Sequence, residues 1–274
     1  MSRIAARFAT LKAEGRGALI PFLEAWDPDP ATSMEILRGM PAAGADLIEI
    51  GCPFTDPMAD GPTVQLAGRR ALNVGATMAH TLAMVREFRT ENNEIPIILM
   101  GYLNPILSYG PARFCTDAAA SGVDGLIIVD LPSEEADLMA ADAAKNGLDI
   151  IRLVAPTTDE DRLPLVLAGS SGFVYYVSIT GVTGTRTASG AELADAIPRI
   201  RKFTDLPIAV GFGVRSPDQA AAAVEAADAA VVASALIDNM VSSLTPEGKA
   251  GPDSVRVVLD QVRALAEAVR AVRK

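Results

Sequence analysis

The chain has 274 residues, half of them hydrophobic, so its composition indicates a globular protein and excludes an intrinsically disordered one. Its 34 acidic and 24 basic residues give a net charge of −10, which argues against non-specific nucleic-acid binding because that requires a basic face. No apolar run reaches the ~18 residues of a membrane span, and no hydrophobic signal region stands at the N-terminus. We therefore expect a cytoplasmic protein that binds neither nucleic acid nor membranes.

Short β-like runs alternate with helical patterns along the whole chain. Eight runs are predicted as strands, at residues 18–25, 46–51, 95–100, 124–130, 148–154, 172–178, 206–211 and 228–234. The helical stretches between them mostly end in glycine, as a helix C-cap does. Residues 253–273 place valine and leucine at i, i+3 and i+4 spacing, which predicts a final amphipathic helix.

This alternation predicts a parallel sheet, and eight strand–helix pairs predict a closed (β/α)8 TIM barrel. We expect an extra helix before the first strand and a short extra helix, SALIDNM, beginning at Ser234 after the eighth. An open doubly wound sheet is the alternative, but such sheets more often stop at about six strands. Because no Gly/Ser-rich linker divides the chain, residues 1–274 are predicted to form one domain.

The second predicted strand, LIEIG, carries an acidic residue inside an apolar run. Glu49 shares one strand face with Leu47 and Gly51, whereas two isoleucines share the opposite face. If the isoleucines pack against helices, Glu49 faces the barrel mouth, where βα loops carry ligand chemistry. A buried carboxylate costs free energy unless it is paired, hydrogen-bonded or protonated, and no Lys or Arg lies nearby in sequence.

The loop after this strand, CPFTDPMADGP, carries Asp60 over the same opening. Two acids of different exposure on one rim are expected for proton-transfer chemistry, because their environments separate their pKa values. The alternative is structural: Glu49 would cap a loop amide, and Asp60 would cap the helix that starts near Pro62.

Glycine and serine mark the ends of the last three predicted strands. They are the GVTGTR segment at 181–186, Gly211, Gly213 and Ser234. In TIM barrels, the loops after strands seven and eight and the N-terminus of an extra helix bind phosphate. We therefore expect a phosphate site here, although any one glycine could serve only a tight turn.

His80 is the only histidine, and it lies in a helical pattern away from the acidic rim. Ser-His-Asp and Cys-His catalysis and a histidine-rich metal site would all need it, so we expect none of them. The two cysteines, Cys52 and Cys115, are too few for a disulfide framework and fit a reducing compartment. No lysine is evident for a Schiff base in a pocket, so we expect no cofactor.

Four segments of the chain resemble one known family in order and spacing. They are IEIGCPFTDPMADGPTVQ, MGYLNPI, SITGVTG and VGFGVRSP, and the family is the tryptophan synthase alpha chain. The resemblance implies the reversible retro-aldol cleavage of indole-3-glycerol phosphate to indole and glyceraldehyde 3-phosphate in L-tryptophan biosynthesis. It implies docking onto a pyridoxal-phosphate beta chain in an α2β2 heterotetramer, which receives indole through a tunnel.

The resemblance also implies residue roles. Glu49 is the general acid/base, and Asp60 stabilises charge on the indole nitrogen. One carboxylate of raised pKa suits both proton transfers of the cleavage. The other implied site residues are Tyr175, which lines the active site; Phe22 and Tyr102, which border the indole pocket; Thr183, which bonds Asp60 when its loop closes; and Gly184, Gly211, Gly213 and Ser234 at the substrate's phosphate end.

Three residues depart from the family pattern. Glu24 replaces a common threonine and has the strand parity of Phe22, so it is predicted to join the mouth and to couple with Glu49 by like-charge repulsion. Trp26 replaces a common glycine, and since tryptophan disfavours positive φ angles, the local turn is predicted to differ. Ala233 replaces a glycine and is predicted to crowd one phosphate oxygen.

Two other functions stay open. Another phosphate-binding lyase or isomerase on the same scaffold would usually show a catalytic lysine or histidine at a strand end, and none is evident. A non-catalytic subunit that only activates a partner is disfavoured by the presence of Glu49 and Asp60. Loops 53–62 and 179–190 are expected to be ordered by a docked partner, which would raise turnover.

Overall fold

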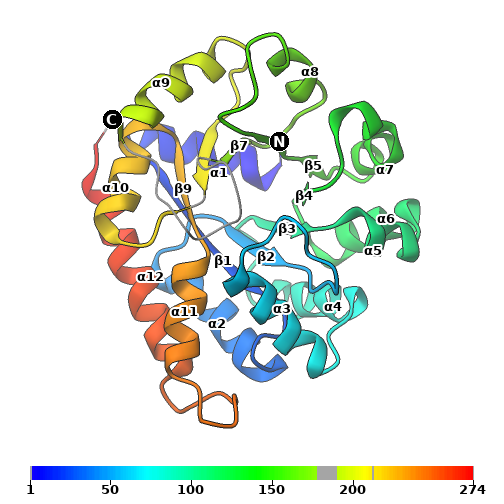
Figure 1. The fold of residues 1–274 in the computed structure, drawn as a ribbon, viewed down its shortest axis with the longest axis vertical. Helices are drawn as coiled ribbons and strands as arrows, with labels where there is room; N and C mark the ends of the chain where they lie inside the picture. The colour runs from blue at the N-terminus through cyan, green and yellow to red at the C-terminus, as the bar shows by residue number, and fades with distance from the viewer. Residues whose placement is uncertain (1, 178–189, 212, 274) are drawn as a thin grey trace.

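The computed structural model describes residues 2–177, 190–211 and 213–273. Its strands form one parallel sheet with the order β5-β4-β3-β2-β1-β9-β8-β7-β6. They are β1 Ala18–Glu24, β2 Ile48–Gly51, β3 Ile97–Gly101, β4 Gly125–Ile128, β5 Asp149–Ile150, β6 Arg152–Val154, β7 Val174–Val177, β8 Ile208–Gly211 and β9 Ala229–Val232. Figure 1 shows these strands at the centre of the molecule, with helices around them.

The sheet closes at its fifth predicted strand. β5 and β6 are separated only by Ile151, so they are the two halves of the run predicted at 148–154. β5 pairs with β4, and β6 pairs with β7. The predicted eight-stranded (β/α)8 barrel is therefore confirmed, because every predicted strand forms and neighbours close the circle.

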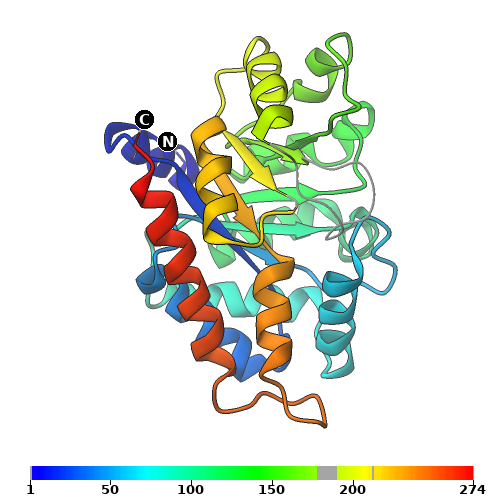
Figure 2. The ribbon, with the colours of Figure 1, turned by 60° about the vertical axis from the view of Figure 1, so that its left-hand side comes forward.

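The helices surround the barrel and cover one of its ends. They are α1 Arg3–Ala13, α2 Pro30–Ala43, α3 Pro62–Asn73, α4 Met78–Arg89, α5 Leu103–Tyr109, α6 Pro111–Ser121, the 3-10 helix η1 Ser133–Leu138, α7 Ala140–Lys145, α8 Leu163–Leu167, α9 Gly190–Arg201, α10 Pro217–Ala226, α11 Ser234–Ser242 and α12 Ser254–Ala271. α1 and α11 are the two predicted extra helices, and α12 is the predicted amphipathic helix. Figures 1 and 2 show α11 and α12 as antiparallel neighbours.

The two faces of β2 separate as its alternation predicts. Ile48 and Ile50 are fully buried in the large core between barrel and helices, together with Leu37 of α2. Leu47 is fully buried in a second apolar cluster, inside the barrel. Glu49 shares the face of Leu47, so its side chain points to the barrel interior.

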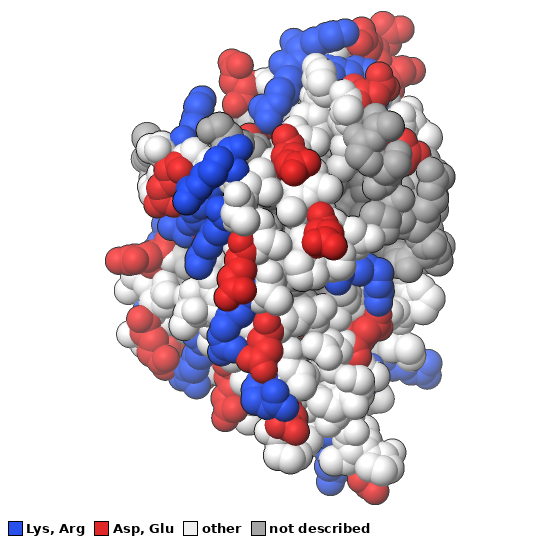
Figure 3. Space-filling view, turned by 90° about the vertical axis from the view of Figure 1, so that its left-hand side faces the viewer, with Lys and Arg blue, Asp and Glu red and all other residues white. Residues whose placement is uncertain are grey.

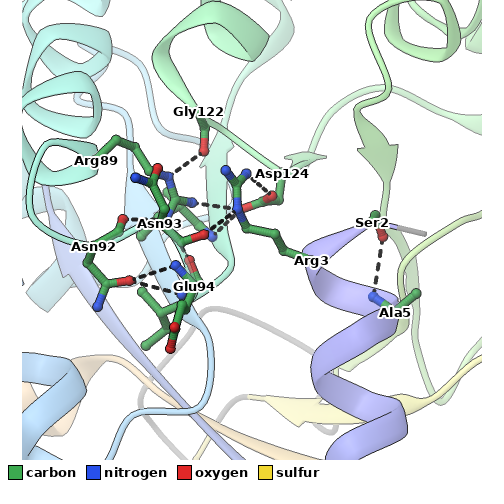
Figure 4. A network of polar contacts seen from close by, with 11 residues as sticks. Ser2, Arg3, Ala5, Arg89, Asn92, Asn93, Glu94, Gly122 and Asp124 are labelled. Atoms are coloured by element: carbon green, nitrogen blue, oxygen red, sulfur yellow. Dashed lines mark hydrogen bonds and ion pairs between the residues drawn. The ribbon is translucent and has the colours of Figure 1, made fainter.

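Helix α1 closes the lower end of the barrel, which we define as the end where the strands begin. Ser2 caps the helix, since its hydroxyl accepts a hydrogen bond from the N–H of Ala5 at 3.2 Å (Figure 4). Ile4, Phe8 and Leu11 are buried in the cluster inside the barrel. The helix therefore acts as an apolar plug at the end opposite the predicted chemistry.

Ion pairs attach this plug to the strands. Asp124 lies between Arg3 at 2.9 Å and Arg89 at 2.7 Å, and the Nε–H of Arg89 donates to the carbonyl of Gly122 at 2.9 Å (Figure 4). Asp124 and Arg89 are both buried. Removing one partner of such a pair leaves an uncompensated buried charge, so this cluster stabilises the fold.

Four polar side chains at the lower end make the same kind of bond. They precede β2, β4, β7 and β9, and each accepts a backbone N–H from the neighbouring strand before it in the barrel, with β5 and β6 counted as one strand. The bonds run from Leu19 to Asp46, from Ile97 to Asp124, from Ile150 to Ser171 and from Ile208 to Asp228, over 2.8–3.0 Å. The lower end thus repeats one hydrogen-bonding unit four times around the barrel.

The outer face formed by α10 and α12 is polar and mixed in charge. Figure 3 shows acidic and basic side chains interspersed on it. On α12, Arg256 pairs with Asp253 and Asp260, and Arg263 also pairs with Asp260. Among the described helices, none is long and apolar enough to cross a bilayer.

Candidate active site

A pocket lies at the end of the barrel opposite α1. It is lined by Phe22, Glu49, Asp60, Val64, Met100, Tyr175, Gly213, Val214, Arg215, Val231, Ala233 and Ser234. Of the predicted site residues, Phe22, Glu49, Asp60, Tyr175, Gly213 and Ser234 are brought together here. Strand parity could have found Met100 and Val231, whereas no signal in the sequence singled out Arg215.

Glu49 is the most deeply placed acid of this pocket, with 1% of its side chain exposed. It lies on β2 between Phe22 of β1 and Ile98 of β3. Among the described residues, its Oε2 atom has no hydrogen-bond partner. Burial, and then the charge of Asp60, raises the pKa of Glu49 to about 8. The carboxyl group is therefore mostly protonated at neutral pH and can donate a proton.

Asp60 lies on the rim and is more exposed than Glu49. Burial raises its pKa to about 6, and a hydrogen bond from Tyr102 opposes that shift. The Tyr102 hydroxyl also accepts the N–H of Ala59 at 3.0 Å, which fixes the loop on the tyrosine. At pH 7 Asp60 is mostly ionised beside a mostly protonated Glu49.

The structural alternative for Asp60 is wrong. Helix α3 has Gly61 as its N-cap and no side-chain capping bond. Asp60 contacts the start of this helix through its backbone: its carbonyl oxygen accepts a hydrogen bond from the Gln65 side chain at 2.8 Å. Its carboxylate is therefore free of a capping role and lines the pocket.

Tyr175 on β7 is 3% exposed, and its ring lines the pocket. Burial, with the charges of Glu49 and Asp60, raises the pKa of Tyr175 well above its ordinary value, so the hydroxyl stays protonated. A Cβ atom on Gly211 would lie 2.1 Å from that hydroxyl. Glycine at 211 is therefore required to make room for the tyrosine, and its predicted contact with substrate stays a prediction.

The phosphate end is formed by the loop after β8 and the start of α11. Gly213 has a φ of 84°, which favours glycine, and it lines the pocket with Ser234. Ala233 is the N-cap of α11, and Ser234 is the first helical residue. The first N–H groups of a helix have no intrahelical acceptor and can bind an anion. Thr183 and Gly184 lie outside the described residues, so their roles stay predictions.

A second, smaller cavity adjoins the first. Both are lined by Phe22 and Asp60, and the second is also lined by Tyr102 and Glu24. Tyr102 was predicted to border the indole pocket, but it lines the second cavity. Its hydroxyl is linked to the first pocket by its hydrogen bond to Asp60.

Glu24 differs in part from its predicted position. Its side chain is 5% exposed and passes over Gly51, where a Cβ atom would lie 2.2 Å from Oε2. Burial and then the charges of Asp60 and Asp27 raise the pKa of Glu24 well above its ordinary value. The pKa of Glu49 is raised by burial and by the charge of Asp60. Glu24 is not among these causes, so the predicted Glu24–Glu49 coupling stays a prediction.

The prediction for Trp26 is also wrong. Its φ is 72°, so tryptophan adopts the backbone conformation that glycine would. The N–H of Trp26 donates to the Ser33 hydroxyl at 3.0 Å, and its indole ring stacks on His80 with centroids 4.2 Å apart. These contacts offset the local strain.

The family model described as "Tryptophan synthase alpha chain" matches residues 8–269. The tryptophan synthase alpha chains of Granulibacter bethesdensis and Gluconacetobacter diazotrophicus are 69% and 68% identical to this chain over 273 residues. Both alignments cover 100% of this chain, and they cover 98% and 100% of the respective relatives.

Solved structures agree with these sequence matches. Tryptophan synthase subunit alpha from Legionella pneumophila has a TM-score of 0.91 at 36% identity, covering 99% of this chain and 100% of that chain. A chain of Mycobacterium tuberculosis tryptophan synthase has a TM-score of 0.88 at 35% identity, covering 98% of both chains. With a full-length family match, this barrel and this pocket, the chain belongs to the tryptophan synthase alpha chain family.

Proposed function

We propose that Glu49 and Asp60 carry out the reaction of this family, the reversible cleavage of indole-3-glycerol phosphate to indole and glyceraldehyde 3-phosphate. The observation that carries the proposal is the separation of their pKa values, about 8 for Glu49 and about 6 for Asp60, within one pocket. At neutral pH this places a proton donor and a negative charge beside the same substrate.

In the cleavage direction, protonated Glu49 donates its proton to indole C3. The ring nitrogen becomes cationic, and the Asp60 carboxylate stabilises that charge. The Glu49 carboxylate then takes the proton from the hydroxyl on the glycerol carbon bonded to C3. The carbon–carbon bond breaks, its electron pair returns to the ring, and the glycerol carbon becomes an aldehyde. Glu49 ends in its starting state, so protons balance.

Other pocket residues bind the substrate. Phe22 offers an apolar ring to indole, and Tyr175 keeps a neutral hydroxyl near Glu49. Gly213 and Ser234, with the N-terminus of α11, bind the phosphate. Thr183 and Gly184 complete this site in the proposal, as the family resemblance implies.

The proposed partner is a tryptophan synthase beta chain, in an α2β2 heterotetramer, in the cytoplasm. Indole is apolar and diffuses away from an isolated lyase, so the pathway is served by a docked enzyme that uses indole as its substrate. Met58, in the loop that carries Asp60, is 81% exposed, and apolar exposure on a functional loop is typical of an interaction site.

The free, buried thiols of Cys52 and Cys115 fit a reducing compartment. We treat residues 1–274 as one functional domain.

Indole release from purified protein tests the catalytic assignment. We expect Glu49→Gln to fold normally and to lose at least ~10²-fold in turnover, the usual effect of losing a general acid/base. Asp60→Asn should be similarly impaired, since an amide supplies no negative charge. Glu134→Gln is the matched control. Glu134 is on η1, is not a lining residue of the pocket, and forms an ion pair with Arg162 over 2.8 Å. Near-wild-type turnover by Glu49→Gln would show the assignment to be wrong.

Titration with a cognate beta chain tests the partnership. Docking beside the loop that carries Asp60 should stabilise its active position and increase indole formation well above that of the isolated chain. Binding must be measured independently, by calorimetry. Unchanged turnover at saturating beta chain, with binding demonstrated, would refute the activation.

A further inference from the structure

One carboxylate joins the phosphate end of the pocket to the segment that carries Asp60. Asp238, on α11, accepts a bond from Arg215 Nη2 to its Oδ2 atom at 2.5 Å. Its Oδ1 atom accepts a bond from the Thr63 hydroxyl at 3.0 Å. Thr63 lies in the first turn of α3, three residues after Asp60. Asp238 is thus bonded to both sides of the site.

Arg215 lines the same pocket as Gly213 and Ser234. It is the only basic residue among the described lining residues, whereas Glu49 and Asp60 are acidic. A phosphate dianion entering a pocket that already holds an ionised carboxylate requires positive charge to offset the repulsion. Backbone N–H groups supply partial charge, and Arg215 supplies a full one.

The pairing of Arg215 with Asp238 leaves donors for a ligand. A guanidinium group has five N–H donors in a planar fork that matches phosphate oxygens, and Asp238 engages Nη2. The side chains of Arg215 and Asp238 are 44% and 43% exposed, so the pair itself contributes little to folding stability. Its geometry instead holds the guanidinium at the pocket.

We propose that Arg215 is a further ligand of the substrate's phosphate, and that Asp238 is a positioning residue that holds Arg215 and connects it to the segment carrying Asp60. This inference rests on the proposed function and adds a charged group to its phosphate site. Phosphate binding then stabilises Arg215, Asp238 and Thr63 together, which fixes the start of α3 when substrate is bound.

Steady-state kinetics with two substrates tests the role of Arg215. For indole-3-glycerol phosphate, Arg215→Ala should raise KM about tenfold or more, because a charge-assisted contact is lost. The KM of Arg215→Lys should lie between those of wild type and Arg215→Ala. For unphosphorylated indole-3-glycerol, Arg215→Ala should leave kcat/KM unchanged. Arg256→Ala, which removes a paired arginine of α12, is the control and should change neither.

A mutant cycle tests the positioning role of Asp238. Asp238→Asn should raise KM several-fold in wild type but cause no further rise in the Arg215→Ala background. Thr63→Val should lower kcat more than it raises KM, because it affects only the Asp60 side. Inhibition by glycerol 3-phosphate should weaken in parallel with KM in the Arg215 and Asp238 variants.

The outcomes separate this inference from the proposed function. If wild type releases no indole, the proposed function fails. If wild type is active and Arg215→Ala keeps its KM and its inhibition by glycerol 3-phosphate, only the inference about Arg215 is overturned. Equal losses on the phosphorylated and unphosphorylated substrates would also overturn it, because they indicate general damage to the site.

Discussion

The ring of Trp26 lies almost parallel to the ring of His80, with an interplanar angle of 10° and 4.2 Å between centroids. The contact joins the loop after β1 to helix α4, and it involves the only tryptophan and the only histidine of the chain. It also explains how a large side chain persists at a φ of 72°. The stack, together with the bond to Ser33, holds a turn where other residues would favour a different backbone conformation.

Loss of this stack should destabilise the protein. We expect His80→Ala to lower the free energy of unfolding by about 0.5–1.5 kcal/mol, the usual contribution of an aromatic pair. Urea denaturation followed by circular dichroism measures it. In a Trp26→Gly background, which restores glycine at positive φ, His80→Ala should have almost no cost. The same cost in both backgrounds would mean that the stack is not the cause.

Catalysis should depend on pH through the two acids. The proposed mechanism requires ionised Asp60, with a pKa of about 6, and protonated Glu49, with a pKa of about 8. A plot of kcat/KM against pH should therefore rise through about 6 and fall through about 8. Because the two acids interact, these limbs belong to the pair. A rate that keeps rising to pH 10 would contradict a protonated Glu49 in the free enzyme.

Burial of Glu49 should cost stability at neutral and alkaline pH. Its pKa is higher in the folded state than in the unfolded state, so the unfolded chain releases this proton first as pH rises. The free energy of unfolding of the wild type therefore decreases as the pH rises from about 4.5, the ordinary pKa, to about 8. Glu49→Gln should be more stable than wild type at pH 8, and the difference should shrink toward pH 4. Chemical denaturation at both pH values measures it, and a pH-independent difference would argue against this origin.

Glu24 should affect stability and not the pH profile. Its pKa is raised mainly by burial, so Glu24→Gln, which keeps the side-chain size, should also be more stable than wild type at alkaline pH. The pKa of Glu49 is raised by burial and by Asp60, so we expect the falling limb of the kcat/KM profile to stay in place in Glu24→Gln. A displaced falling limb would support the like-charge coupling that the sequence suggested.

Strand alternation was sufficient to predict the barrel and the placement of Glu49. Apolar runs and helix patterns each depend on neighbouring residues, so the eight strands and the last helix could be predicted from local order. The orientation of Glu49 could be predicted because side chains alternate along β2, so that the face opposite the two isoleucines points into the barrel. The fifth predicted strand, at 148–154, agrees with β5 and β6 to within one residue, although its division at Ile151 depends on a change of pairing partner.

Other features depend on contacts between distant parts of the chain. Trp26 and His80 are far apart in sequence, and no local pattern predicts that their rings meet. Strand parity places Glu24 on the face of Phe22, but it does not give the path of this long side chain past Gly51. No sequence pattern marks Arg215, because an arginine in the loop after β8 is like any solvated residue until the pocket is formed.

The fourfold hydrogen-bonding unit at the lower end has a consequence for adaptation. The ion pairs of Asp46, Asp124 and Asp228 lie at the opposite end of the barrel from the pocket that holds Glu49 and Asp60. In such barrels, one end governs stability and the other governs chemistry. Substitutions that strengthen the lower end can therefore increase heat resistance without changing turnover, and the same end is where a thermostable form of this enzyme should be engineered.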